Sequence, residues 1–70
     1  MITKKQLLSG KSLLFGNNEN EGDMYYNFKL NTYVILYNSK CVSSSKTYAA
    51  GLKKLTNLFE KDNLNIFEIY

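Results

Sequence analysis

The stretch MYYNFKLNTYVILY, residues Met24–Tyr37, predicts two adjacent β-strands. In its first half the apolar side chains recur at every second position, which is the period of a strand with one buried face. The face expected to be buried holds Met24, Tyr26, Phe28 and Leu30. The residues between them are expected to point to the other side of the sheet, and they are Tyr25, Asn27 and Lys29.

The second half of this stretch, Thr32–Tyr37, is a run of β-branched and aromatic residues with apolar side chains on both faces. Such a run is typical of a strand inside a sheet, so we predict it to be the central strand. Asn31-Thr32 is expected to form the turn that precedes it. Asn38-Ser39-Lys40 is expected to form the turn that follows it.

A long helix is predicted over Ser45–Lys61. Ser43, Ser44 and Ser45 are candidate N-caps, because a serine hydroxyl accepts from the free N–H groups of the first helical turn. The apolar stripe has helical spacing and consists of Tyr48, Leu52, Leu55, Leu58 and Phe59. Gly51 within it costs about 1 kcal/mol relative to alanine, unless a strand packs closely there.

Shorter elements are predicted on either side. A short helix through Leu7 is expected to be capped by Thr3, with Ile2 and Leu7 in contact, and Leu13–Phe15 is expected to be a strand. Asn17–Asp23 is polar and is predicted to be a loop. The last strand, Asn65–Tyr70, is expected beside Thr32–Tyr37 after a crossover through the helix.

These elements predict a single small α+β domain over residues 1–70. Its sheet is expected to be antiparallel, or mixed, with three to four strands. One long helix in the C-terminal half packs on the sheet, and a short helix precedes it at the N-terminus. A core of this size typically gives about 3–5 kcal/mol of net stability, so a partner or a second copy would help to stabilise the chain.

The residue inventory excludes most catalytic and metal-binding sites. The chain has no histidine, arginine, tryptophan or proline, and its single cysteine is Cys41. All nine positive charges are lysines, against six acids, which gives a net charge of +3. The arginine fork that grips phosphate or carboxylate is therefore absent. We expect no enzyme, no metal site and no cofactor.

Two loop motifs fail at specific residues. Asn17–Gly22 resembles the start of a calcium-binding loop, but the bidentate glutamate needed at its twelfth position falls on Phe28. Gly10-Lys11-Ser12 lacks the earlier glycine and the preceding strand of a phosphate-binding loop. Each is expected to be a plain loop or turn.

Nucleophilic and acid–base chemistry fail as well. No histidine is present to activate Cys41, which is expected to be a small packed residue. Glu19, Glu21 and Asp23 are expected in a polar loop where nothing desolvates them enough to separate their pKa values. The remaining acids, Glu60, Asp62 and Glu68, are expected at the helix surface, the helix end and the strand surface.

Tyrosines and lysines form the one promising binding surface. The residues expected to form it, or to border it, are Tyr25, Lys29, Tyr33, Tyr37, Lys53, Lys54 and Tyr70. Exposed tyrosines suit a protein interface, so the leading hypothesis is a non-catalytic protein-binding module. The first alternative is a single-stranded nucleic-acid binder that stacks bases on the tyrosines. The second is a small structural subunit that is stable as an oligomer.

Composition also indicates a source and a compartment. Nine asparagines and the absence of arginine indicate an AT-rich coding sequence, which is common in low-GC bacteria, in their phages and plasmids, and in some eukaryotic parasites. The small size, the composition and the absence of catalytic residues together favour a phage or mobile-element accessory protein that inhibits a host enzyme or defence factor by stoichiometric binding, although no motif indicates this role. The single cysteine favours a reducing interior, and the longest apolar run, Tyr33–Tyr37, is too short to cross a membrane. We therefore expect a cytoplasmic protein.

Overall fold

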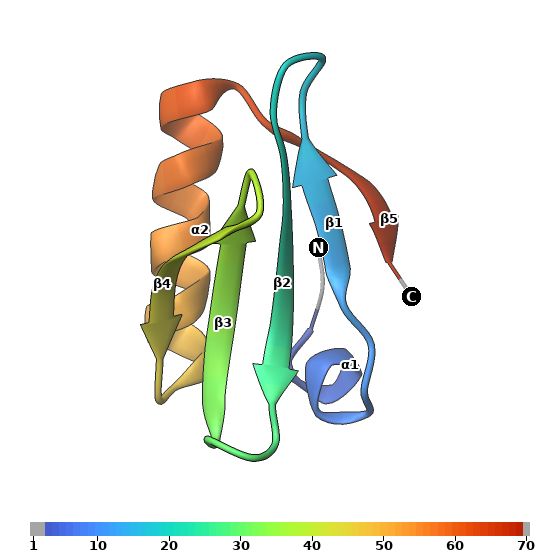
Figure 1. Ribbon diagram of the computed structural model, residues 1–70. Helices are drawn as coiled ribbons and strands as arrows, with labels where there is room; N and C mark the ends of the chain where they lie inside the picture. The colour runs from blue at the N-terminus through green and yellow to red at the C-terminus, as the bar shows by residue number, and fades with distance from the viewer. Residues whose placement is uncertain (1–2, 70) are drawn as a thin grey trace.

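The computed structural model describes residues 3–69, which form two helices and five strands (Figure 1). In chain order these are α1 (Lys4–Leu8), β1 (Leu13–Gly16), β2 (Glu21–Asn27), β3 (Thr32–Tyr37), β4 (Lys40–Ser45), α2 (Tyr48–Asp62) and β5 (Asn65–Ile69). The strands form one sheet in the order β4-β3-β2-β1-β5, and each neighbouring pair is antiparallel. The α+β class is therefore confirmed, whereas the predicted number of three to four strands is too low.

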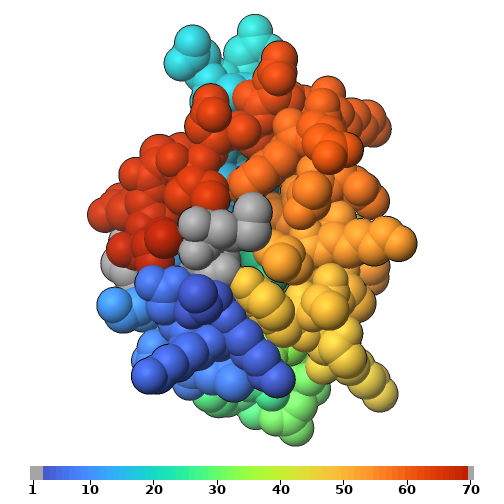
Figure 2. All heavy atoms as spheres, turned by 180° about the vertical axis from the view of Figure 1, so that it is seen from behind, coloured from blue at the N-terminus to red at the C-terminus, as the bar shows by residue number. Residues whose placement is uncertain are grey.

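Both helices lie on one face of the sheet, so the described part of the chain has two layers. The view from behind shows α2, in yellow to orange, and α1, in blue, in front of the sheet (Figure 2). No helix formed by residues 3–69 covers the opposite face, which is the one turned toward the viewer in Figure 1. We call this uncovered side the open face.

The strand that the sequence did not predict is β4. Ser43, Ser44 and Ser45 were expected to cap the long helix, but they pair with β3 instead. The helix begins at Tyr48, and its N-cap is Thr47, whose hydroxyl accepts the N–H of Ala50 at 3.3 Å. A polar segment can form an edge strand, because main-chain hydrogen bonds hold it and its side chains, apart from the buried Ser45, keep contact with water.

The last strand lies at the opposite edge from the predicted one. β5 pairs antiparallel with β1 and not with β3, so the expected neighbour was wrong. The free side of β3 is already occupied by β4. The chain crosses one face of the sheet as α2, and β5 then pairs with β1, which is the edge strand that is still free.

β2 begins earlier and ends earlier than the sequence indicated. It starts at Glu21, so Asp23 is a strand residue and not a loop residue. It ends at Asn27, whose side-chain oxygen accepts the N–H groups of Lys29 and Leu30 at 3.0 and 3.1 Å. The turn is therefore residues 28–31, and the predicted Asn31-Thr32 turn was misplaced. Phe28 lies in this turn and is exposed, although it was expected on the buried face.

The core lies between the sheet and the two helices. Its buried members are Leu7, Leu13, Phe15, Met24, Tyr33, Ile35, Leu55 and Leu64. The predicted stripe of α2 faces this core, with Leu55 buried and Tyr48, Leu58 and Phe59 partly buried against it. Gly51 meets the sheet closely, since a Cβ added there would lie 3.3 Å from the Cβ of Tyr33. This close packing of a strand is the condition under which a glycine in the middle of the helix is favourable.

α1 has the predicted cap. The Thr3 hydroxyl accepts the N–H of Gln6 at 3.3 Å, and the Gln6 side chain accepts the N–H of Thr3 at 2.8 Å. This reciprocal pair is a capping box. The expected contact between Ile2 and Leu7 lies outside the described residues.

Candidate protein-binding surfaces

The predicted tyrosine face is not assembled. In β3 the side chains of Tyr33, Ile35 and Tyr37 point toward the helices. Their paired residues in the neighbouring strand β2 lie on the core side, and these are Tyr26, Met24 and Gly22. Tyr33 is only 3% exposed. Thr32, Val34 and Leu36 take the open face instead. Because β3 is apolar on both faces, its sequence alone did not reveal which set is covered.

Tyr37 is a structural residue in this arrangement. Its ring stacks on Phe15, with centroids 6.0 Å apart, and its hydroxyl donates to Asp62 Oδ2 at 3.0 Å. Burial, this hydrogen bond and the charge of Asp62 all raise the pKa of Tyr37. The residue therefore joins β3 to the end of α2 and is not part of a solvent-facing platform.

The other residues of the predicted surface are scattered over the molecule. Tyr25 is on the open face, whereas Lys29 lies in the turn between β2 and β3. Lys53 and Lys54 are exposed on α2, and the ammonium of Lys54 donates to the carbonyl of Ser44 at 3.0 Å. Tyr70 lies outside the described residues.

The open face carries an apolar row interrupted by one carboxylate. Asp23 on β2 pairs with Leu14 of β1 on one side and with Leu36 of β3 on the other. The next row joins Tyr25 to Val34, which is only 7% exposed although no helix formed by residues 3–69 covers it. The side chains of neighbouring strands therefore shield one another here.

Asp23 stands at a shallow hollow of about 270 Å³. The hollow is lined by Leu14, Glu21, Gly22, Asp23, Leu36 and Ser39. The Oδ1 atom of Asp23 is buried and has no hydrogen-bond partner within residues 3–69. Burial raises the pKa of this carboxyl group. The expectation that nothing desolvates Asp23 was therefore wrong, because it assumed a loop where the chain forms a strand.

The charges around the hollow are negative. Glu21 is two residues before Asp23 on the same strand and has the same facing. Glu68 of β5 pairs with Leu14 and so lies on the other side of that leucine. Three of the six acids are thus gathered on the open face of a chain with net positive charge.

A second hollow lies between the edge strand β4 and α2. It measures about 240 Å³ and is lined by Val42, Ser43, Lys54, Asn57, Leu58 and Lys61. Its two charged residues are both lysines, and its apolar floor is formed by Val42 and Leu58. We call it the β4–α2 groove.

The remaining chemical candidates have ordinary structural surroundings. Asn17 begins the loop between β1 and β2, and its side-chain oxygen accepts the N–H groups of Glu19 and Asn20 at 2.9 and 2.8 Å. Cys41 is exposed on β4, so the prediction that it is packed was wrong. Within residues 3–69 no group of three or more Cys, His, Asp or Glu side chains could hold a metal ion.

No helix in the described part of the chain is long and apolar enough to cross a membrane. Comparison with protein-family models, curated proteins and solved structures gives no match for this chain.

Proposed function

We propose that this chain is a non-catalytic protein-binding module that binds its partner through the open face. The observation that carries the proposal is the buried Oδ1 of Asp23, which lies between Leu14 and Leu36 and has no hydrogen-bond partner among residues 3–69. A buried acceptor without a donor costs free energy in the isolated chain. A donor from a partner, placed in the hollow and met by a rotation of the Asp23 carboxylate, would recover that free energy on binding.

Charge narrows the class of partner. Glu21 and Glu68 lie on the same face as Asp23, so the bound surface should be basic at its centre. Leu14, Leu36 and Tyr25 would contact apolar side chains around it. The fitting partner is therefore a folded protein that presents a lysine or arginine within an apolar patch.

The two alternatives from the sequence receive less support on this face. Nucleic-acid stacking needs exposed aromatics near positive charge, whereas Tyr33 and Tyr37 face the helices and the open face carries acids. A second copy placed on the open face would bring the same carboxylates against one another, which opposes association.

A protein that acts through such a surface acts stoichiometrically. We extend the proposal to the role expected from composition, a cytoplasmic accessory protein of a phage or mobile element that blocks a host enzyme or defence factor. The support for this extension is the AT-rich residue bias and the small size of the chain.

Affinity capture from a lysate of the host cell, with a matched set of baits, tests the proposal. The baits are the unchanged chain, Asp23→Leu and Glu60→Leu, the last of which removes the same charge from an exposed position on α2. We expect one protein to be retained in stoichiometric amount by the unchanged chain and by Glu60→Leu, and to be lost with Asp23→Leu. Circular dichroism establishes that all baits are folded. A partner retained equally by Asp23→Leu, or no stoichiometric partner, would overturn the proposal.

A further inference from the structure

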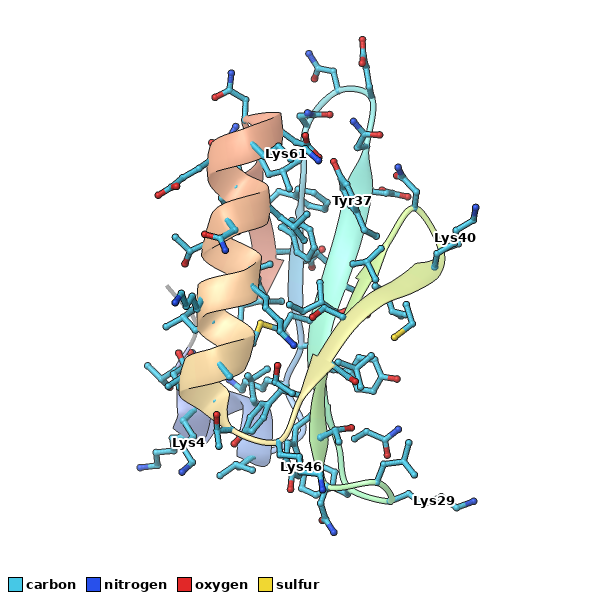
Figure 3. All side chains as sticks on the ribbon, turned by 90° about the vertical axis from the view of Figure 1, so that its left-hand side faces the viewer. Lys4, Lys29, Tyr37, Lys40, Lys46 and Lys61 are labelled. Atoms are coloured by element: carbon cyan, nitrogen blue, oxygen red, sulfur yellow. The ribbon has the colours of Figure 1, made fainter. Side chains whose placement is uncertain are left out.

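The β4 edge of the sheet is open within the described part of the chain. β4 pairs with β3 on one side, and residues 3–69 place no strand on its other side. Figure 3 looks onto this edge and shows β4 beside α2. The β4–α2 groove lies between these two elements. An open edge presents main-chain N–H and C=O groups that can pair with an added strand.

Lysines surround this edge. Lys40 and Lys46 stand at the two ends of β4, and Lys61 stands at the far end of α2 (Figure 3). Lys54 and Lys61 line the groove itself. Four of the nine lysines therefore border one strand edge.

One of these lysines already binds the edge backbone. The ammonium of Lys54 donates to the carbonyl oxygen of Ser44 at 3.0 Å. This carbonyl is therefore accessible from the α2 side of β4, where an added strand would place an N–H group. Pairing with such a strand would replace the Lys54 contact and free its ammonium for a carboxylate on the incoming segment.

The groove also has an apolar contact surface. Val42 is 49% exposed and lies at the irregularity in the pairing of β3 with β4, between Cys41 and Ser43. Leu58 of α2 lies across the groove from it. In a strand that alternates apolar and acidic residues, the apolar side chains would cover Val42 and Leu58, and the acidic side chains would approach the lysines.

A second copy does not fit this edge. Antiparallel pairing of β4 with β4 would bring Lys40 of one copy toward Lys46 of the other, and like charges placed opposite each other oppose pairing. Charge complementarity selects an acidic segment of a different protein.

We propose that β4 accepts an extended, acidic segment of a partner protein as a sixth strand, with its carboxylates on Lys54 and Lys61. This inference goes beyond the proposed function, because it assigns a different surface and a different partner chemistry from those of the open face. The β4 proposal can fail while the open-face proposal holds, and the open-face proposal can fail while the β4 proposal holds.

The test uses the purified full chain and synthetic peptides, followed by NMR. The probe is a blocked octapeptide that alternates valine and glutamate. One control peptide replaces glutamate with lysine. A second control peptide keeps the side chains of the probe, but the backbone amides that would pair with β4 are N-methylated and cannot donate hydrogen bonds. We expect the acidic peptide alone to shift the amide signals of β4 and α2 and to slow hydrogen exchange along β4.

Variants locate the charge contacts. The double variant Lys54→Glu/Lys61→Glu is expected to weaken binding of the acidic peptide about tenfold, because two exposed ion pairs are lost and two repulsive pairs replace them. The matched control, Lys4→Glu/Lys5→Glu on α1, changes the net charge equally and should leave the affinity unchanged.

Three results would overturn the inference. The first is equal binding of the N-methylated peptide, which would mean that charge alone attracts it. The second is equal weakening by the α1 control. The third is a single-stranded oligonucleotide that binds the same lysines more tightly than the acidic peptide does.

Discussion

At the scale of single residues, the proposed function sets stability and binding in opposition at Asp23. Its carboxylate lies between two leucines and has one oxygen that no group in residues 3–69 satisfies. Replacement of such a group by an apolar side chain of similar size is commonly neutral or stabilising. Asp23→Leu should therefore unfold at an equal or higher urea concentration than the unchanged chain, while it loses the partner. A clear loss of stability would show that the carboxylate serves the fold.

The pH dependence of stability tests the same residue. Burial raises the pKa of Asp23 above its ordinary value of 3.8, so the folded chain holds this proton more tightly than the unfolded chain does. As the pH rises above that value, the unfolded chain ionises first and the free energy of unfolding falls. Asp23→Asn has no carboxyl group at this position, so its free energy of unfolding does not fall with pH for this reason. Its stability relative to the unchanged chain should increase from about pH 3 to about pH 7 in urea titrations, and a constant difference would contradict the burial.

Gly22 is the residue that brings β2 close to Phe15. A Cβ at this position would overlap the Phe15 ring and would lie 2.6 Å from the carbonyl oxygen of Leu36. Gly22→Ala is therefore expected to lower the free energy of unfolding by about 1–3 kcal/mol. Gly51→Ala is the comparison, since its nearest contact is 3.3 Å and the helix gains from alanine. An equal or larger loss in Gly51→Ala would contradict this account.

At the scale of elements, the start of α2 is the point where the structure differs from the start expected from the sequence. The serines predicted as caps lie in β4, and the hydroxyl of Thr47 caps the helix. Thr47→Ala should lower the free energy of unfolding by about 1 kcal/mol in thermal or urea unfolding. Ser44→Ala, at an exposed position in β4, should change it little. The reverse order of effects would place the helix start at the serines.

Elements defined by local patterns were predicted, and those defined by distant pairing were not. The alternation in Met24–Asn27, the apolar run of β3, the stripe of α2 and the cap of α1 all follow from neighbouring residues. β4 has no apolar period, and it is a strand because β3 offers it hydrogen bonds. The position of β5 likewise depends on which edge β4 leaves free.

The candidate site followed the same division. Tyr25 was placed on the solvent side correctly, because the period of β2 fixes its face relative to Met24. Tyr33 and Tyr37 were placed wrongly, since β3 is apolar on both faces and only the contact with α2 selects one. Asp23 was missed because the polar run before it predicted a loop. The alternation of Met24 and Tyr26 continues backward to Gly22, and this continuation indicated that the strand already includes Asp23.

At the scale of the whole molecule, charge is divided between two surfaces. The open face gathers Glu21, Asp23 and Glu68, whereas the β4 edge is bordered by lysines. A net charge of +3 conceals this division. The two proposals therefore place a basic partner and an acidic segment at different surfaces of the molecule.

The central claim is that the open face is the surface that meets the partner, and site-specific photo-crosslinking tests it most directly. A benzophenone amino acid replaces Tyr25 on the open face in one chain and Lys5 on the outer side of α1 in another. After irradiation in a lysate of the host cell, we predict a single stoichiometric protein adduct from position 25 and none from position 5. An adduct from position 5 alone, or from neither position while both chains are folded, would contradict the account.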